Sequence, residues 1–222
     1  MIISSKKIRS LLTFILLAIS IPFTGSLLAG ELKVKITRDI ASVEVIHQGE
    51  KVVIQRNQDG KNTIASDYAI TSRDCPPFCI RPIKLAPGVE TIAELEMLEY
   101  LQKLTKGDKS ILVIDSRTPG WVKKGTIPGS VNIPWTSLSL TAGGNSLGIA
   151  DILTEQFGVT FEDDLYNFSN AKTLVMFCNG MWCGQSPKNI ITLIGLGYPA
   201  DKIKWYRGGM QDWHILGLTT IK

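Results

Sequence analysis

LVMFCNGMWCGQSPKNIITLIGLG, residues 174–197 of this 222-residue chain, contains the pattern from which its architecture can be inferred. Its first four residues are apolar, a run of the length typical of a strand buried in a parallel sheet. Ser186 and Pro187 then suit the N-cap and the first position of a helix, which Gly197 would end. We therefore predict an α/β fold in which a buried strand ends at Cys178 and a short loop leads into a helix.

Cys178 stands where such a fold can activate a thiol. The loop that follows it can turn successive backbone N–H groups toward one point, and the helix dipole adds partial positive charge there. A thiolate or a persulfide at that point is stabilised, so we expect the pKa of Cys178 to be lowered. The alternative is an inert cysteine at the end of a buried strand.

The residues from 90 to 115 continue the α/β pattern. Thr91 and Glu94 fit a capping box, and apolar residues at helical spacing follow until Gly107. ILVI at residues 111–114 then predicts another buried strand.

Residues 30–89 have a different pattern. LKVKI (32–36), SVEVI (42–46) and KVVIQ (51–55) alternate apolar and polar side chains, so they predict a small β segment. Residues 71–89, TSRDCPPFCIRPIKLAPGV, contain four prolines and predict an irregular connector.

Two cysteines lie in this connector, Cys75 and Cys79. We interpret them as a structural disulfide or two ordinary thiols that hold the connector in place. A second redox pair near the active site is the alternative interpretation.

The first 29 residues have the pattern of a secretory signal: three cations, then an apolar run at 11–21. The cations are Lys6, Lys7 and Arg9. We predict either cleavage, after Ser26 or near residue 29, or an uncleaved anchor formed by residues 11–30. In both cases the body is exported, so we expect a periplasmic location, with membrane contact only through an uncleaved N-terminus.

The formal net charge of +4 arises mostly at this end, because subtracting those three cations leaves +1. A nearly neutral body gives no reason to expect nucleic acid as a partner. The four cysteines allow three disulfide pairings, and their C-x3-C and C-x4-C spacings are not those of a common zinc site. We predict no metal and no cofactor, with a four-cysteine zinc centre as the lesser alternative.

Three blocks of the sequence resemble the rhodanese family. Residues 115–134, DSRTPGWVKKGTIPGSVNIP, resemble its first signature; FCNGMWCGQS takes the place of its active-site loop; and YRGGMQDW at 206–213 resembles its closing motif. The resemblance implies a doubly wound α/β sheet with helices on both faces. The small β segment predicted from the alternating pattern would precede it. The predicted organisation is therefore residues 1–29 as signal or anchor, 30–89 as β segment and connector, and 90–222 as a rhodanese-like domain.

The resemblance also implies a mechanism, in which the Cys178 thiolate takes up sulfane sulfur as a persulfide and an acceptor removes it. The implied active-site loop consists of Asn179, Gly180, Met181, Trp182, Cys183 and Gly184. Backbone N–H groups of this loop would hold the bound sulfur. We interpret Asp115 and Arg117 as a brace for the end of a strand, with a direct role in the chemistry as the alternative, and expect Arg207 to lend positive charge to the site.

The implied partners are a sulfur donor and an acceptor. The donor would be thiosulfate, a polysulfide or a low-molecular-weight persulfide, and the acceptor a thiol or a protein.

The loop departs from the family pattern in two ways. It has no Arg or Lys between Cys178 and Ser186, and Cys183 occupies a place where a basic or hydroxyl residue is common. The first departure disfavours thiosulfate as the natural donor. The second favours a redox role for Cys183, with a small side chain that fills the turn as the alternative.

Two other functions stay open at this point. One is a thioredoxin-like oxidoreductase that uses Cys178 and Cys183, and the other is a non-catalytic rhodanese-like binding module. A thioredoxin-like protein would leave the blocks at 115–134 and 206–213 unexplained, whereas binding modules of the family usually lack the loop cysteine. We therefore favour a sulfurtransferase.

Overall fold

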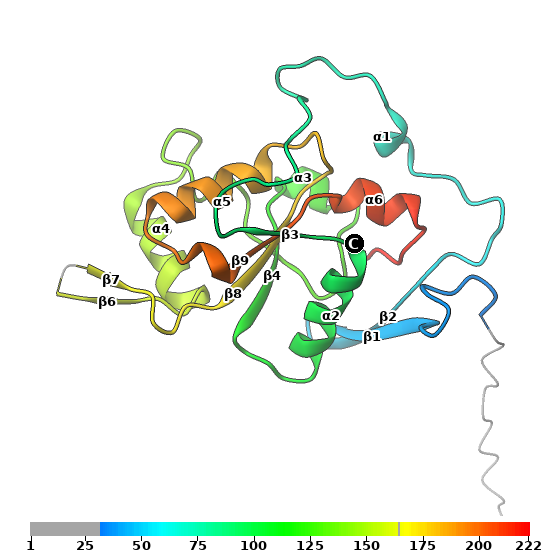
Figure 1. The fold of residues 1–222 in the computed structure, drawn as a ribbon, viewed down its shortest axis with the longest axis horizontal. Coiled ribbons are helices and arrows are strands. Elements are labelled where there is room, and N and C mark those ends of the chain that lie inside the picture. Colours follow the sequence, from blue (N-terminus) through cyan, green and yellow to red (C-terminus); the bar gives the residue numbers. More distant parts are fainter. Residues whose placement is uncertain (1–31, 164) are drawn as a thin grey trace, which may run out of the picture. The chain divides into compact units, whose positions relative to one another are not determined.

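A five-stranded parallel sheet forms the centre of this computed structural model, which describes residues 32–163 and 165–222 (Figure 1). The strand order is β3-β9-β8-β4-β5, so β8 lies in the middle with a parallel neighbour on each side. The strands are β3 (Glu90–Ile92), β4 (Ile111–Asp115), β5 (Val131–Asn132), β8 (Thr173–Phe177) and β9 (Ile203–Tyr206). The buried strands predicted at 111–114 and 174–177 are confirmed.

Helices pack on both faces of this sheet. Val175 and Phe177 of β8 belong to a core shared with α2 and α6, whereas Leu174 and Met176 belong to a second core shared with α4 and α5. The alternation follows from the pleat of a strand, which turns successive side chains to opposite faces. The helices are α1 (Ser66–Ala69), α2 (Glu94–Thr105), α3 (Pro119–Val122), α4 (Ser146–Asp151), α5 (Gln185–Gly195) and α6 (Gly209–Ile215), with a π-helical turn at Ile152–Gln156 and a 3-10 turn at Ala200–Lys202. The predicted doubly wound α/β fold is confirmed.

The small β segment is a hairpin of β1 (Ser42–His47) and β2 (Glu50–Gln55). Its turn has positive φ at both Gln48 and Gly49, as a two-residue hairpin turn requires. The third predicted strand, LKVKI at 32–36, is wrong. Its backbone N–H groups at Lys33 and Val34 bond the side chain of Gln58 instead of a neighbouring strand. A second hairpin joins β6 (Thr160–Glu162) and β7 (Leu165–Asn167).

The start of α2 differs from the predicted capping box. Thr91 lies in β3 and pairs with Trp205 of β9, so the helix begins only at Glu94. Ala93 is the N-cap, and the carboxylate of Glu96 accepts a hydrogen bond from its backbone N–H. Pairing with a neighbouring strand therefore overrides the local capping signal at Thr91.

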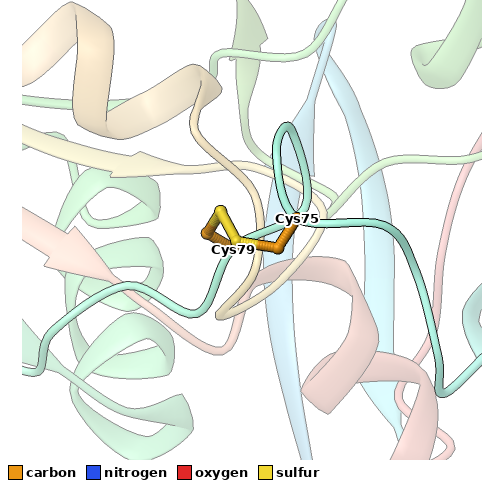
Figure 2. The surroundings of a disulfide bond; sticks show 2 residues. All are labelled: Cys75 and Cys79. Atoms are coloured by element: carbon orange, nitrogen blue, oxygen red, sulfur yellow. A yellow bond between two sulfur atoms is a disulfide. The ribbon is translucent and has the colours of Figure 1, made fainter.

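Residues 71–89, which we call the connector, run from α1 to β3 without a helix or strand (Figure 1). A disulfide joins Cys75 and Cys79 within it (Figure 2). The predicted signal or anchor, residues 1–29 or 11–30, lies outside the described residues. In the part of the chain that the structure describes, none of the helices has the length and apolar character needed to span a bilayer.

Candidate active site

Cys178 follows β8 directly and lies at the carboxyl end of the central strand. Open α/β sheets place their ligands at this end. The side chain of Cys178 is 2% exposed, and helix α5 begins seven residues later at Gln185. The predicted N-cap at Ser186 is wrong, because Gly184 is the N-cap and Ser186 lies within the first turn of the helix.

Because it lies within the first turn of α5, Ser186 contacts the sulfur of Cys178 instead of capping the helix. Its hydroxyl donates a hydrogen bond to the sulfur of Cys178 at 3.1 Å. The indole N–H of Trp205 donates to the same hydroxyl at 3.2 Å, so the single hydroxyl proton is left for the sulfur. Sequence reasoning missed both residues, since a serine before a helix is ordinarily a cap and a tryptophan is ordinarily core.

These contacts shift the pKa of Cys178. Burial by itself raises the pKa, because it disfavours the charged thiolate. Hydrogen bonds from the Cys183 thiol, the Ser186 hydroxyl and the backbone N–H groups of Ser186 and Gly180 outweigh burial and lower the pKa to about 7. Burial and the neighbouring Cys178 raise the pKa of Cys183. Of the two thiols, Cys178 is therefore the one that ionises near neutral pH.

Ser186→Ala tests this arrangement. Removal of the hydroxyl is expected to move the pKa of Cys178 upward by about 1–2 units, since a hydrogen bond to a charged group is worth about 1.5–3 kcal/mol. The measurement is the rate of alkylation by iodoacetamide against pH, with Thr192→Ala on the same helix as the control. An unchanged midpoint in Ser186→Ala would show that this hydroxyl does not stabilise the thiolate.

The loop after Cys178 is fixed to the start of α6. The backbone N–H groups of Met210 and Gln211 donate to the carbonyl groups of Cys178 and Asn179, both at 2.9 Å. Gly209 has a φ of +55°, and a Cβ at this position would overlap the carbonyl oxygen of Cys178. The second glycine of the YRGGMQDW block therefore permits the close approach of α6 to the active-site loop.

Asp115 and Arg117 form a buried ion pair below the loop. The Arg117 guanidinium donates to both carboxylate oxygens of Asp115 and to the carbonyl oxygen of Gly125. It also donates to the hydroxyl of Tyr68 at 3.0 Å and to Oδ1 of Asn179 at 3.5 Å. Burial lowers the pKa of Arg117, but hydrogen bonding to Asp115 and the nearby negative charges outweigh it and raise that pKa.

Met181 and Trp182 face the connector. Arg73 lies over the Trp182 ring at 4.4 Å, and the ring of Phe78 meets it edge-on at 5.6 Å. Met181 and Trp182, together with Cys75 and Cys79, line a cavity of about 670 Å³ between the connector and the loop. The connector disulfide therefore lies beside the active-site loop, whereas Cys178 and Cys183 are free thiols.

Arg207 bonds the connector. Its Nε and Nη2 atoms donate to the carbonyl oxygen of Arg81, and the backbone N–H of Arg81 in turn donates to the carbonyl of Met181. Arg81 itself reaches Gly184, the last residue of the loop. Sequence reasoning sought a cation within the loop and did not identify this one, which comes from a segment about 100 residues earlier.

The four cysteines do not come together as a zinc site of four thiolates. The disulfide joins Cys75 to Cys79, so a site of four thiolates is not available. Within residues 32–163 and 165–222, no three side chains of His, Cys, Asp or Glu gather as a metal site would require.

Comparison with known proteins identifies one family and several structures of low similarity. The family model of the rhodanese-like domain matches residues 97–216. No curated protein matches the chain. Among solved structures, a human single-domain sulfurtransferase is 20% identical, with 55% of this chain and 93% of that chain covered and a TM-score of 0.37.

Two bacterial structures show comparable similarity. A protein from Bacillus halodurans is 19% identical over 56% of this chain and 70% of its own, with a TM-score of 0.38. A Rhodopseudomonas palustris protein of unknown function, described as a possible tyrosine phosphatase, is 19% identical over 69% of this chain and 100% of its own, with a TM-score of 0.42. The family match covers more than half of the sequence, from α2 to the end of α6, and includes Cys178 and its loop. This chain therefore belongs to the rhodanese-like domain family.

Proposed function

We propose that this chain is a periplasmic sulfurtransferase that carries sulfane sulfur as a persulfide on Cys178. The observation that carries the proposal is the thiolate site, in which hydrogen bonds from Ser186, Cys183 and the loop backbone lower the pKa of a buried cysteine to about 7. The thiolate is the nucleophilic form of cysteine, and a lowered pKa makes this form more available at neutral pH. Membership of the rhodanese-like family supports the same chemistry.

The proposed reaction has two steps. In the first, the Cys178 thiolate attacks the sulfane sulfur of a donor R–S–SH; the donor S–S bond breaks, and its electron pair leaves as the thiolate RS⁻. In the second, an acceptor thiolate attacks the outer sulfur of the Cys178 persulfide and releases the Cys178 thiolate. The hydroxyl of Ser186 and the N–H of Gly180 stabilise the negative charge when Cys178 is released. The acceptor is a small thiol or a protein thiol.

The proposed periplasmic location is supported by the connector. Its disulfide, Cys75–Cys79, is of a kind that persists in oxidising compartments and is rare in the bacterial cytosol. When the full chain is expressed in a bacterium and the cells are fractionated, it is expected outside the cytoplasm with both cysteines oxidised. Recovery from the cytoplasm with reduced cysteines would contradict this location.

The test of sulfur transfer is direct loading. The purified protein is incubated separately with thiosulfate, an inorganic polysulfide and glutathione persulfide, and the peptide that contains Cys178 is analysed by mass spectrometry. One added sulfur atom on Cys178 is expected with at least one donor. If no donor adds sulfur while iodoacetamide still alkylates Cys178 with a midpoint near pH 7, the protein is folded and the sulfurtransferase proposal fails.

One observation favours a second candidate, a thiol–disulfide oxidoreductase. Cys183 lies near enough to Cys178 to lower the pKa of its thiol, and both cysteines are free. Two thiols in contact can close to a disulfide by reducing an external disulfide, which leaves as a dithiol. This activity would require both cysteines, whereas sulfur loading requires only Cys178. Catalysed reduction of a protein disulfide that is lost in both Cys178→Ser and Cys183→Ser would favour this candidate.

A further inference from the structure

We propose that Arg81 of the connector forms an anion subsite beside Cys178, which selects sulfur donors with a negatively charged end. The inference deepens the proposed function, on which it rests for the identity of the donor. The subsite is formed by the guanidinium of Arg81 and the backbone around Gly184. Arg81 lies outside the region that matches the family model, residues 97–216, so the cation that the loop lacks is supplied by a different part of the chain.

The contact between Arg81 and Gly184 is close. A Cβ atom built on Gly184 would lie 2.6 Å from Nη2 of Arg81 and 3.3 Å from its Cζ. The backbone of Gly184 has a φ of −98° and a ψ of 1°, a conformation that any residue can adopt. A side chain at 184 would therefore leave the backbone unstrained but would have to displace the Arg81 guanidinium.

The guanidinium of Arg81 has no partner for its charge. Among residues 32–163 and 165–222, no carboxylate and no hydrogen-bond acceptor meets it, and its Nε is buried without a partner. A guanidinium presents several N–H donors in one plane and binds the oxygen atoms of anions in pairs. An unpaired guanidinium against Gly184, the last residue of the loop that follows Cys178, is thus suited to the oxygen atoms of a bound anion.

Two contacts hold Arg81 in this position. Its backbone N–H donates to the carbonyl of Met181 in the loop, at 2.8 Å. Its carbonyl oxygen accepts hydrogen bonds from Nε and Nη2 of Arg207. The backbone of Arg81 is therefore bonded through both its N–H and its carbonyl group. The Cys75–Cys79 disulfide closes the chain two residues before it. The backbone of Arg81 is therefore held against the loop, which keeps its side chain within reach of Gly184.

For a donor of the thiosulfate type, the chemistry balances without another reactant. The Cys178 thiolate attacks the outer sulfur, the S–S bond breaks, and its electron pair leaves with sulfite, while Cys178 keeps the sulfur as a persulfide. Arg81 would bind the sulfonate oxygen atoms before and during this step. The carboxylates of glutathione persulfide offer the same oxygen-anion chemistry, so the experiment compares these two sources.

The first experiment does not depend on sulfur transfer. Cys178 is alkylated by iodoacetate, which is anionic, and by iodoacetamide, which is neutral and has the same leaving group. Arg81→Gln is expected to lower the ratio of the two rates by about tenfold, since a charge-assisted hydrogen bond is worth roughly one such factor. Gly184→Ala is expected to lower it similarly, because its methyl group displaces the flexible end of Arg81. Lys84→Gln, an exposed cation in the same connector, is the matched control and should leave the ratio unchanged.

The second experiment measures the reaction of Cys178 with thiosulfate and with glutathione persulfide, which leave a persulfide on Cys178. It also measures the reaction with the uncharged dimethyl trisulfide, which leaves a methyl disulfide or trisulfide on Cys178 and releases the rest of the reagent as CH3SS⁻ or CH3S⁻. Arg81→Gln is expected to slow loading by an anionic donor about tenfold and to change loading by the uncharged donor less than about twofold. If Arg81→Gln slows loading by only one of the two anionic donors, the subsite binds the anionic group of that donor, which is the sulfonate of thiosulfate or a carboxylate of glutathione persulfide. An unchanged alkylation ratio in Arg81→Gln, or an equal loss for all reagents, would overturn the subsite. If Arg81→Gln lowers the alkylation ratio as expected but no donor loads Cys178, the anion subsite is supported and the sulfurtransferase proposal is refuted.

Discussion

Cys178→Ser is expected to abolish sulfur loading, with a loss of at least about a thousandfold in the transfer rate. A serine hydroxyl is not ionised near neutral pH and cannot hold sulfane sulfur as a persulfide. The substitution removes one sulfur atom from a buried position and keeps a hydrogen-bonding group beside Ser186, so the fold should be retained. The measurement is the amount of sulfur on the protein by mass spectrometry, together with the release of the donor's product.

Cys183→Ser is the informative control for this result. Cys183 is the thiol with the raised pKa, and its Sγ donates a hydrogen bond to Oε1 of Gln185 at 3.8 Å, which a serine hydroxyl can also donate. Loading of Cys178 is therefore expected to continue in Cys183→Ser, within about threefold of the original rate. If Cys183→Ser loses loading as completely as Cys178→Ser, the two thiols act as one redox unit, and the persulfide carrier is the wrong mechanism.

The position of Cys178 could be predicted from sequence because every signal for it is local. LVMF is a buried strand by composition and length, and SPKN followed by apolar residues is the start of a helix. The loop between them must then lie at the carboxyl edge of the sheet, whatever the other elements do. The same locality explains the hairpin turn at Gln48 and Gly49, where the turn chemistry alone specifies the conformation.

The errors have a common physical origin, in that a tertiary contact displaced a local preference. Ser186 has the side chain of an N-cap, but the helix starts one residue before it and its hydroxyl bonds the Cys178 sulfur. Thr91 likewise pairs with β9 in place of capping α2. Periodicity and capping patterns contain no information on which strand will lie beside a residue, so these two outcomes were not predictable from the local sequence.

The connector shows the limit of motif reasoning most clearly. Its composition predicts an irregular segment, and an irregular segment is found. Composition says nothing about where such a segment lies, and the structure brings Arg73, Phe78 and Arg81 against the loop that follows Cys178. The absence of a cation between Cys178 and Ser186 argues against an anionic donor only if the loop acts alone. With Arg81 beside Gly184, this argument against thiosulfate loses its force.

Arg117→Met is expected to destabilise the protein by about 3–5 kcal/mol, because it leaves the buried carboxylate of Asp115 without its countercharge. Both side chains are fully buried, and the guanidinium joins four parts of the structure. Besides Asp115 at the end of β4, it bonds the carbonyl of Gly125, the hydroxyl of Tyr68 in α1 and Oδ1 of Asn179 in the loop. Methionine fills much of the volume but satisfies none of these acceptors. The measurement is the free energy of unfolding in urea.

The double variant Asp115→Leu with Arg117→Met separates the unpaired charge from the loss of packing. Removal of both charges is expected to recover a substantial part of the stability lost in Arg117→Met, since a buried pair replaced by apolar groups is often close to neutral. Recovery should be incomplete, because the Thr126 hydroxyl loses the Asp115 oxygen that accepts its hydrogen bond at 2.7 Å. A loss below about 1 kcal/mol in Arg117→Met would be incompatible with a buried, uncompensated Asp115. In that case the pair would not brace the strand end beneath the Cys178 loop.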